Sequence, residues 1–415
     1  MIKPSAVRTP VLVTTLVGTL YVVAACEPAD LSDASTPPAV LGEPRVLPSP
    51  ARSGSGEPNL FVVGDTILMS WLEPVGEEVA LRFARLVGDA WDEPMTVVRR
   101  ADLFVNWADF PSVIQLPGGL LAAHWLQYSG PGTYSYDVLV STSRDGGSTW
   151  SESGRPHSDG TPVEHGFVSL FPASGTDALT AVWLDGRAYA DTTAAKPFMS
   201  LRQASLGSEG GWTDRHVLDD RTCDCCQTSA ARTPDGVIVA YRGRTEDEIR
   251  DIRVVRYEAG RWSDPVTVHD DGWEIPACPV NGPSISARGD TVAIAWFTAA
   301  DEKPRVRLAF SHDGGRTFRD PVLIDGDRPL GRVSVSAIEG GALVTWLAAS
   351  ESGAMVLARA LGLDGRGTRA IAIGESSVER ASGFPSMVTR GREMVAAWTL
   401  PGDPRTIRIV AAPLY

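Results

Sequence analysis

Cysteine is scarce in this sequence: there are five in 415 residues, and three of them lie between Cys223 and Cys226. Runs of basic residues are also absent, and a net charge of −13 argues against nucleic-acid binding. After the N-terminal region no apolar run approaches the ~20 residues of a membrane-spanning helix. Long helical patterns are missing, while Gly and Pro separate short alternating apolar runs. These absences exclude a helical bundle and predict an all-β protein.

The N-terminal region carries an export signal. Lys3 and Arg8 precede an uncharged, mostly apolar run over residues 11–25, and small residues lead directly to Cys26. The run VVAAC resembles the lipobox of bacterial lipoproteins, which implies that Cys26 becomes the lipidated first residue of the mature chain. An ordinary signal peptide with a chance cysteine is the alternative. Glu27 follows where inner-membrane lipoproteins often have Asp. We therefore predict a lipid-anchored protein of the bacterial cell envelope, at the outer membrane.

Two columns of residues recur in phase along the rest of the chain. Aromatic residues recur every 50 to 58 positions, and small polar residues precede them by 12 to 14 positions. The aromatic column is Trp71, Trp125, Trp183, Tyr241, Trp296, Trp346 and Trp398. The polar column is Asn59, Ser112, Ser169, Ser229, Ser284, Ser334 and Ser386. Such repeats predict similar sheets that cover each other's faces, with the aromatic column as core between them.

Each repeat has room for four strands, and four antiparallel strands per repeat around an axis form a β-propeller. The last repeat has only three apolar runs, whereas EPRVLP (residues 43–48) resembles the fourth-strand runs of other repeats. We predict seven four-stranded blades closed by this N-terminal strand, with a six-bladed ring as the alternative. The domains are then a signal peptide over 1–25, a tether rich in Pro, Ala, Ser and Asp over 26–42, and the propeller over 43–415.

Two turns have the pattern Ser-x-Asp-x-Gly-x-Thr followed by Trp or Phe, in STSRDGGSTW and AFSHDGGRTF. Asp145 and Asp313 are expected to accept backbone N–H groups, with Gly147 and Gly315 in left-handed backbone. On these turns and repeats the chain resembles the Asp-box (BNR-repeat) sialidase-like superfamily of propellers. The resemblance implies that the turns are structural and lie opposite the functional face.

The functional face is expected to consist of loops that join neighbouring blades and loops that join second to third strands. The repeat phase assigns all cysteines except Cys26 to adjacent loops of this face. The fourth repeat departs from the pattern, because Tyr241 and Arg242 replace Trp-Leu or Trp-Phe. We expect Arg242 to point to a carboxylate, phosphate or carbonyl group, and the alternative is a structural ion pair with Asp185 or Glu248.

The resemblance also implies a chemistry, because the family's enzymes hold a substrate carboxylate with three arginines and use an Asp acid/base and a Tyr–Glu nucleophile. The candidate ligand-binding residues are Arg187, Arg242, Arg244 and Arg332. The candidate catalytic residues are Asp109, Asp185, Tyr241 and Glu248. The family's Arg-Ile-Pro motif has no clean counterpart, and its catalytic domains have six blades. We therefore expect a propeller that binds a glycan or small anionic ligand, with an exo-sialidase or other glycoside hydrolase as the alternative.

The cysteines leave three interpretations open. In an oxidising compartment, two disulfides would tie the cluster of Cys223, Cys225 and Cys226 to Cys278 and leave a Cys-x-Cys or vicinal pair. Four thiolates also suit zinc or Cu(I), with His165 as an extra ligand, although Cys-x-Cys-Cys is not the usual zinc spacing. A nucleophilic or redox cysteine is the third interpretation. The cofactor is accordingly zinc, copper or none.

Overall fold

The computed structural model describes Met1 and residues 38–415, apart from 173–178, 192, 194–196 and 208–209. The predicted signal peptide, the lipidation site Cys26 and most of the tether lie outside the described residues. Within the described part, no helix is long and apolar enough to cross a membrane.

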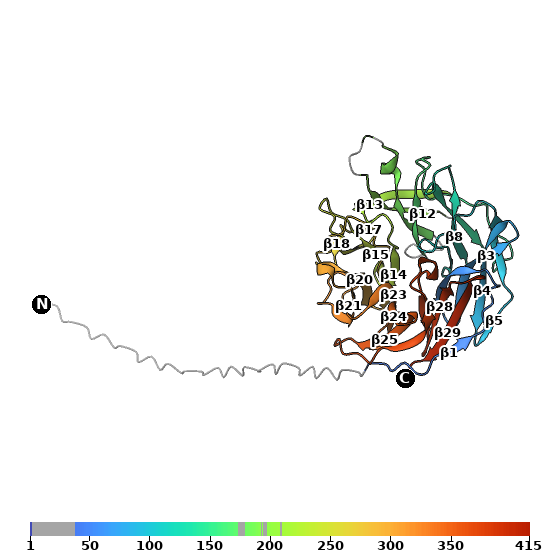
Figure 1. The fold of residues 1–415 in the computed structure, drawn as a ribbon. Helices are drawn as coiled ribbons and strands as arrows, with labels where there is room; N and C mark the ends of the chain where they lie inside the picture. Colours follow the sequence, from blue (N-terminus) through green and yellow to red (C-terminus); the bar gives the residue numbers. More distant parts are fainter. Residues whose placement is uncertain (2–37, 173–178, 192, 194–196, 208–209) are drawn as a thin grey trace. The chain divides into compact units, whose positions relative to one another are not determined.

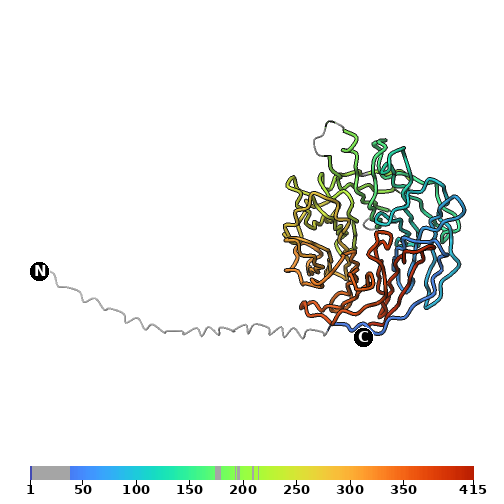
Figure 2. Tube along the Cα trace, viewed as in Figure 1, coloured from blue at the N-terminus to red at the C-terminus, as the bar shows by residue number. Residues whose placement is uncertain are grey.

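Seven small antiparallel sheets are arranged in a ring, and the chain passes through them in sequence (Figure 2). The protein is therefore a seven-bladed β-propeller, as predicted. Blade 1 contains β2 (Gly56–Val63), β3 (Thr66–Val75), β4 (Glu78–Val87), β5 (Ala90–Trp91) and β6 (Met95–Arg100). Blade 2 contains β7 (Ser112–Gln115), β8 (Leu121–Tyr128) and β9 (Tyr136–Ser143). Blade 3 contains β10 (His165–Pro172), β11 (Leu179–Asp185), β12 (Met199–Leu206) and β13 (Trp212–Thr222).

The remaining blades follow the same antiparallel order. Blade 4 contains β14 (Ser229–Thr233), β15 (Gly236–Arg242), β16 (Ile252–Glu258), β17 (Arg261–Trp262) and β18 (Val266–Thr267). Blade 5 contains β19 (Ser284–Arg288), β20 (Thr291–Thr298), β21 (Arg305–Ser311) and β22 (Val322–Asp325). Blade 6 contains β23 (Pro329–Ile338), β24 (Gly341–Ser350), β25 (Gly353–Gly362) and β26 (Ile371–Ser376). Blade 7 contains β27 (Ser386–Arg390), β28 (Glu393–Leu400) and β29 (Thr406–Pro413).

The ring is closed by an N-terminal strand. β1 (Arg45–Leu47) pairs antiparallel with β29, so that Arg45 lies opposite Ala411 and Leu47 opposite Ile409. In Figure 1 the blue β1 runs beside the red β29. The predicted closure is confirmed, and it covers an edge that would otherwise expose unpaired backbone groups.

The two sequence columns have different structural roles. Every member of the aromatic column is at most 4% exposed, and each lies in a hydrophobic cluster between sheets. Several serines of the polar column instead accept hydrogen bonds from the backbone of the next blade. Ser284 Oγ accepts from Val335 N at 3.0 Å, and Ser386 Oγ accepts from Leu60 N at 3.0 Å. One column therefore supplies the apolar core, and the other links the inner strands around the ring.

Blade 2 departs from the expected four strands. Beyond β9, two isolated bridges, Val140–Gly154 and Tyr136–Glu164, stand in place of a fourth strand among the described residues. The segment SESGRPHSDGTP (residues 151–162) contains two prolines, two glycines and no large apolar residue, so it has no alternating face to bury. It crosses the blade's outer side as irregular chain.

The face with the third-to-fourth strand connections, which we call the turn face, carries the two matching turns. Thr149 N and Thr317 N each donate 2.9 Å bonds to Oδ1 of Asp145 and Asp313, respectively. Gly147 and Gly315 have φ angles of +99° and +85°. The expected turn geometry is present in both.

Candidate functional site

The opposite face, which we call the loop face, carries the predicted site residues and the cysteines. Its loops either lead from one blade to the inner strand of the next or connect the second strand of a blade to its third. The side chains gather over blades 2 to 5 in three groups: the cysteine loop, a set of ion pairs, and a buried carboxyl–tyrosine cluster.

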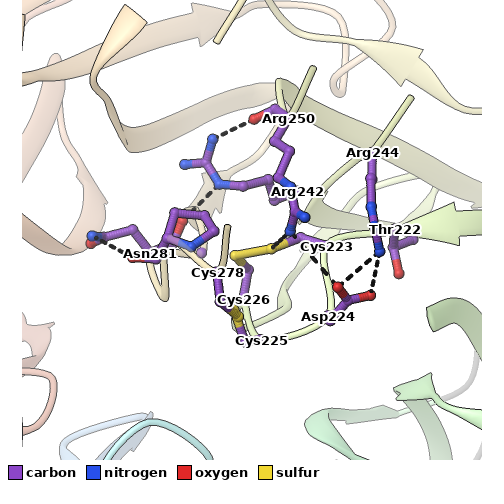
Figure 3. Close-up of a disulfide and its surroundings, with 12 residues drawn as sticks. Thr222, Cys223, Asp224, Cys225, Cys226, Arg242, Arg244, Arg250, Cys278 and Asn281 are labelled. Carbon is purple, nitrogen blue, oxygen red and sulfur yellow. Dashed lines mark hydrogen bonds and ion pairs between the residues drawn. A yellow bond between two sulfur atoms is a disulfide. The ribbon is translucent and has the colours of Figure 1, made fainter. Parts of the chain in front are cut away.

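The four cysteines form two disulfides, Cys223–Cys226 and Cys225–Cys278, with Cα atoms 5.9 and 6.1 Å apart (Figure 3). The second joins the entrance of blade 4 to the entrance of blade 5, as expected. The prediction for the other pair was wrong, because it is neither Cys-x-Cys nor vicinal. Two residues separate Cys223 from Cys226, and this spacing gives the Cα separation that a disulfide prefers.

Joined sulfurs leave no thiolate for zinc or copper in this state. Cys223 and Cys226 are buried, whereas Cys278 is exposed. His165, considered as an extra ligand, lies among aspartates: its Nε2 is 3.2 Å from Asp159 Oδ1.

The residue after the cysteine cluster extends to two other blades. Gln227 Nε2 donates to Ala108 O at 2.6 Å, and Gln227 Oε1 accepts from Gly282 N at 3.1 Å. Gln227 also lines the central cavity of about 320 Å³ between the inner strands. A Cβ on Gly282 would lie 2.6 Å from Gln227 N, so glycine is needed there. The disulfides thus fix a loop that holds blades 2, 4 and 5 together at the loop-face end of this cavity.

Arg242 binds the protein itself. It is 1% exposed, and its guanidinium donates to the backbone oxygens of Asn281 (2.9 Å), Arg250 (2.6 Å) and Phe297 (2.6 Å) (Figure 3). Burial lowers its pKa to about 10. A carbonyl partner was among the predicted ones, whereas among the described residues Arg242 forms no ion pair with Asp185 or Glu248, because its guanidinium is occupied by these three carbonyls. Where other repeats have a Leu or Phe after the column aromatic, a single guanidinium here donates to three backbone carbonyls.

Arg332 has a similar role between blades 6 and 7. It is 8% exposed, donates to Gly383 O at 2.9 Å, and lies 5.0 Å from the ring centre of Trp107. Burial lowers its pKa to about 10. Two of the four arginines proposed for ligand binding therefore satisfy backbone and aromatic groups of the propeller.

Arg244 lies in a partly exposed network at the cysteine loop. It makes two hydrogen bonds to the Glu248 carboxylate, at 2.9 and 2.8 Å. Two more, at 3.1 and 2.9 Å, join it to Asp224 (Figure 3). Arg250 adds a 3.0 Å bond to Glu248. The bonds from Arg244 lower the pKa of Glu248 to about 2, so Glu248 is a carboxylate at neutral pH. Tyr189 is 42% exposed, and burial together with its electrostatic interaction with Asp224 raises its pKa to about 12.

Asp185 and Arg187 form a second ion-pair group. Arg187 Nε lies 2.6 Å from Asp185 Oδ1, and Arg187 Nη2 lies 3.2 Å from Asp159 Oδ1. Asp185 also accepts the indole N–H of Trp183 at 2.9 Å. Burial would raise the pKa of Asp185, but Arg187 and His165 outweigh it and lower the pKa below its ordinary value.

Asp109 belongs to a carboxyl–tyrosine cluster. The Tyr136 hydroxyl lies 2.9 Å from Asp109 Oδ2 and 2.8 Å from Glu164 Oε1. Burial raises the pKa of Asp109 to about 8 and that of Glu164 to about 7. The tyrosine has one hydroxyl proton, so one of the two carboxyls is itself protonated and donates to Tyr136. A Cβ on Gly166 would lie 1.9 Å from the Asp109 carboxylate, so the cluster also requires glycine there.

Tyr241 lies apart from these groups. It is 0% exposed between blades 3 and 4, and its hydroxyl donates to Asp219 at 2.7 Å. It is the blade-4 member of the aromatic column, with a phenol in place of an indole. Its predicted catalytic role has no support from this position.

Four residues of the loop face were not singled out from the sequence: Tyr136, Glu164, Tyr189 and Asp224. Glu164, Tyr189 and Asp224 lie in connections that the repeat phase assigned to this face, and Tyr136 begins β9 directly after another of them. Their types are common in loops, and no spacing distinguishes them. Only the contacts with Asp109 and Arg244 reveal them.

No family model and no curated protein sequence matches this chain. A solved protein of unknown function from Dyadobacter fermentans is similar, at a TM-score of 0.51 and 14% identity over 92% of this chain and 100% of that one. A Hadza microbial sialidase has a TM-score of 0.46 at 15% identity, over 81% of this chain and 73% of that one. The GH93 alpha-L-arabinofuranosidase of Fusarium graminearum, solved with arabinobiose, has a TM-score of 0.45 at 15% identity, over 90% and 98%. At these identities the similarity concerns the fold.

Proposed function

We propose that the loop face over blades 3 and 4 binds a carbohydrate or another hydroxyl-rich ligand, anionic ones included. The observation that carries this proposal is the partly exposed network of Arg244 with Asp224 and Glu248, whose Asp224 also interacts electrostatically with exposed Tyr189 and with Glu164. Together these side chains offer an aromatic ring, carboxylate acceptors and guanidinium donors on one partly exposed surface. Such a mixture of polar groups suits the hydroxyls and ring faces of a sugar.

The test is a glycan array probed with the full chain in detergent. Arg244→Ala removes the donor that organises Asp224 and Glu248, and we expect about tenfold weaker binding. Arg316→Ala is the matched control, because Arg316 also contacts two carboxylates, Asp235 and Glu258, but lies on the turn face. Equal binding by wild type and Arg244→Ala would contradict the proposed site.

Glycoside hydrolysis is the second candidate function, and the protonated carboxyl in the Asp109–Tyr136–Glu164 cluster favours it. A general acid must hold a proton near neutral pH, and burial provides this here. The contact between Tyr136 and Glu164 matches the Tyr–Glu pair implied by the sialidase resemblance better than Tyr241 does. Glu164 is the more exposed of the two carboxyls and is the one we expect to meet a substrate.

A panel of aryl glycosides, sialosides included, tests hydrolysis. Any turnover by the wild type should fall at least about a hundredfold in Glu164→Gln. Glu246→Gln, at an exposed glutamate of the same face, should leave it unchanged. Absence of turnover on every substrate would leave binding as the function.

We also propose that the chain is anchored at the outer membrane through lipid on Cys26. The small residues before Cys26 and the Pro- and Ala-rich segment after it support this proposal. Mass spectrometry of the mature N-terminus should find an acylated cysteine, and Cys26→Ser should move the protein from the membrane fraction to the soluble fraction.

A further inference from the structure

A second pocket lies on the turn face, between blades 3 and 4. Its volume is about 520 Å³, within the range of small-molecule sites. Its lining comes from all four strands of blade 3, from the turn-face ends of β15 and β16, and from the connection after Tyr257. It is therefore separate from Arg244, Glu248 and the cysteine loop, which lie on the loop face.

The inner wall of this pocket is uncharged and combines aromatic and aliphatic side chains with neutral polar ones. Trp262 and Tyr257 stand beside each other with ring centres 5.3 Å apart and planes at 54°. Phe171 and Val237 line the pocket with them. Half-buried tryptophan and tyrosine rings combine an apolar face with a polar edge, and this suits a ligand that has both.

One buried polar atom in this wall has no partner. Gln203 is 3% exposed, and its Nε2 donates to Ser205 Oγ at 2.9 Å. Ser205 Oγ lies 3.2 Å from Thr180 Oγ1, so these three side chains form a chain of hydrogen bonds along the wall. Among the described residues Gln203 Oε1 has no hydrogen-bond partner, although the atom is buried and Gln203 lines the pocket. A buried carbonyl oxygen without a partner is unfavourable, so a donor from outside is expected to satisfy it.

We propose that this pocket is a binding site for a neutral sugar ring. The free Gln203 oxygen requires a donor, and a sugar hydroxyl supplies one, whereas phosphate and carboxylate groups do not. The Trp262 and Tyr257 rings suit the apolar face of a pyranose. The ionisable lining residues His216, Arg261 and Asp264 are exposed and lie at the rim. The inner wall therefore offers no charged group to pair with a charged ligand.

The test is saturation-transfer NMR of the full chain in detergent with free glucose, galactose, mannose and N-acetylglucosamine. At least one sugar should receive saturation from the wild type. Gln203→Met keeps the side-chain length but removes the amide, and it should weaken binding about fivefold or more. Trp262→Leu should weaken it about tenfold. Trp91→Leu is the matched control, since Trp91 has the same place in blade 1 and does not line this pocket.

Gln203→Met should weaken binding by the same factor in the wild type and in an Arg244→Ala background, which separates the turn-face pocket from the loop-face site proposed above. Thermal unfolding of each variant shows which of them fold, and if Trp262→Leu does not, Gln203→Met decides. Saturation lost in Gln203→Met in both backgrounds but kept in Trp91→Leu would support the proposal. Failure of every sugar to receive saturation, or undiminished binding by Gln203→Met, would overturn it.

Discussion

The two faces of this propeller are stabilised in different ways. On the turn face, the same short hydrogen-bond pattern occurs twice, around Asp145 and around Asp313, and each pattern is contained within one turn. On the loop face, several contacts join different loops, as where Gln227 reaches from blade 4 to Ala108 and to Gly282. The turn face therefore repeats a local pattern, whereas the loop face depends on contacts that occur once, several of them long-range. Substitutions on the two faces should therefore differ in how much they lower the free energy of unfolding. They should also differ in the sign of the pH dependence of stability and in their effect on ligand binding.

The largest difference should come from the covalent links of the loop face. Cys225→Ser/Cys278→Ser removes a bond between residues separated by 53 positions, and should lower the free energy of unfolding by about 4 kcal/mol. Cys223→Ser/Cys226→Ser, at a separation of 3, should cost about 2 kcal/mol by the same loop-entropy argument. Urea unfolding of both double variants measures this. Equal losses would mean that the bonds act through local packing and not by joining blades 4 and 5.

Glycine substitutions should come next. A Cβ at Gly147 would lie 2.4 Å from Phe83, and a Cβ at Gly315 would lie 2.2 Å from Ile238, both on backbone with positive φ. Gly147→Ala and Gly315→Ala should therefore each lower the free energy of unfolding by about 2–3 kcal/mol. Because the two turns match, their losses should agree closely. Gly166→Ala should cost a similar amount on the loop face, and it should also displace Asp109. Thermal unfolding gives the stabilities, and a glycan array should detect a change only for Gly166→Ala.

The pH dependence should have opposite signs on the two faces. Bonds from Thr149 lower the pKa of Asp145 to about 2, so its stabilisation is present above pH ~4 and is lost as the pH falls towards 2. Burial raises the pKa of Asp109 to about 8, so the folded state holds a proton that the unfolded state releases above pH ~4. Stability should then fall between pH 4 and 8 by up to about 1.4 kcal/mol per pH unit.

Urea unfolding from pH 2 to 9 measures both slopes. Asp109→Asn should flatten the fall between pH 4 and 8, and Asp145→Asn should flatten only the acid limb. A wild-type stability that rises steadily from pH 4 to 8 would show that the carboxyl–tyrosine cluster does not hold the inferred proton.

The smallest effect should come from the links between inner strands, which belong equally to both faces. Ser284→Ala removes the acceptor for Val335 N and should cost about 1 kcal/mol. Ser334→Ala, at the next position of the same column, should cost about as much, because Met387 N donates to Ser334 Oγ at 3.2 Å. Urea unfolding can compare the two, and a loss above about 2 kcal/mol for either would mean that the column does more than link blades.

The fold could be predicted from the sequence because a propeller repeats its local signals. The position of Trp71 predicted those of Trp296 and Trp398, and EPRVLP identified the closing strand by its likeness to other outer strands. Blade 2 is the exception, since its polar segment after residue 150 does not pair as the repeat predicts. The loop-face site was predicted only in outline. The loops were assigned correctly, but Arg242 and Arg332 proved to bind the propeller, while Tyr136, Glu164, Tyr189 and Asp224 were missed.

The sequence by itself determined the propeller, its closure and which loops share a face, because alternation, turn residues and repeat phase are local and occur seven times. Only the tertiary structure decided which cysteines pair, that Arg242 is occupied by backbone carbonyls, that Asp109 shares a hydroxyl with Glu164, and that Gln203 has an unpartnered oxygen. Each of these depends on distances between loops or blades that occur once. A contact that occurs once leaves no repeated pattern in the sequence, and its energy is defined only when both partners have been placed.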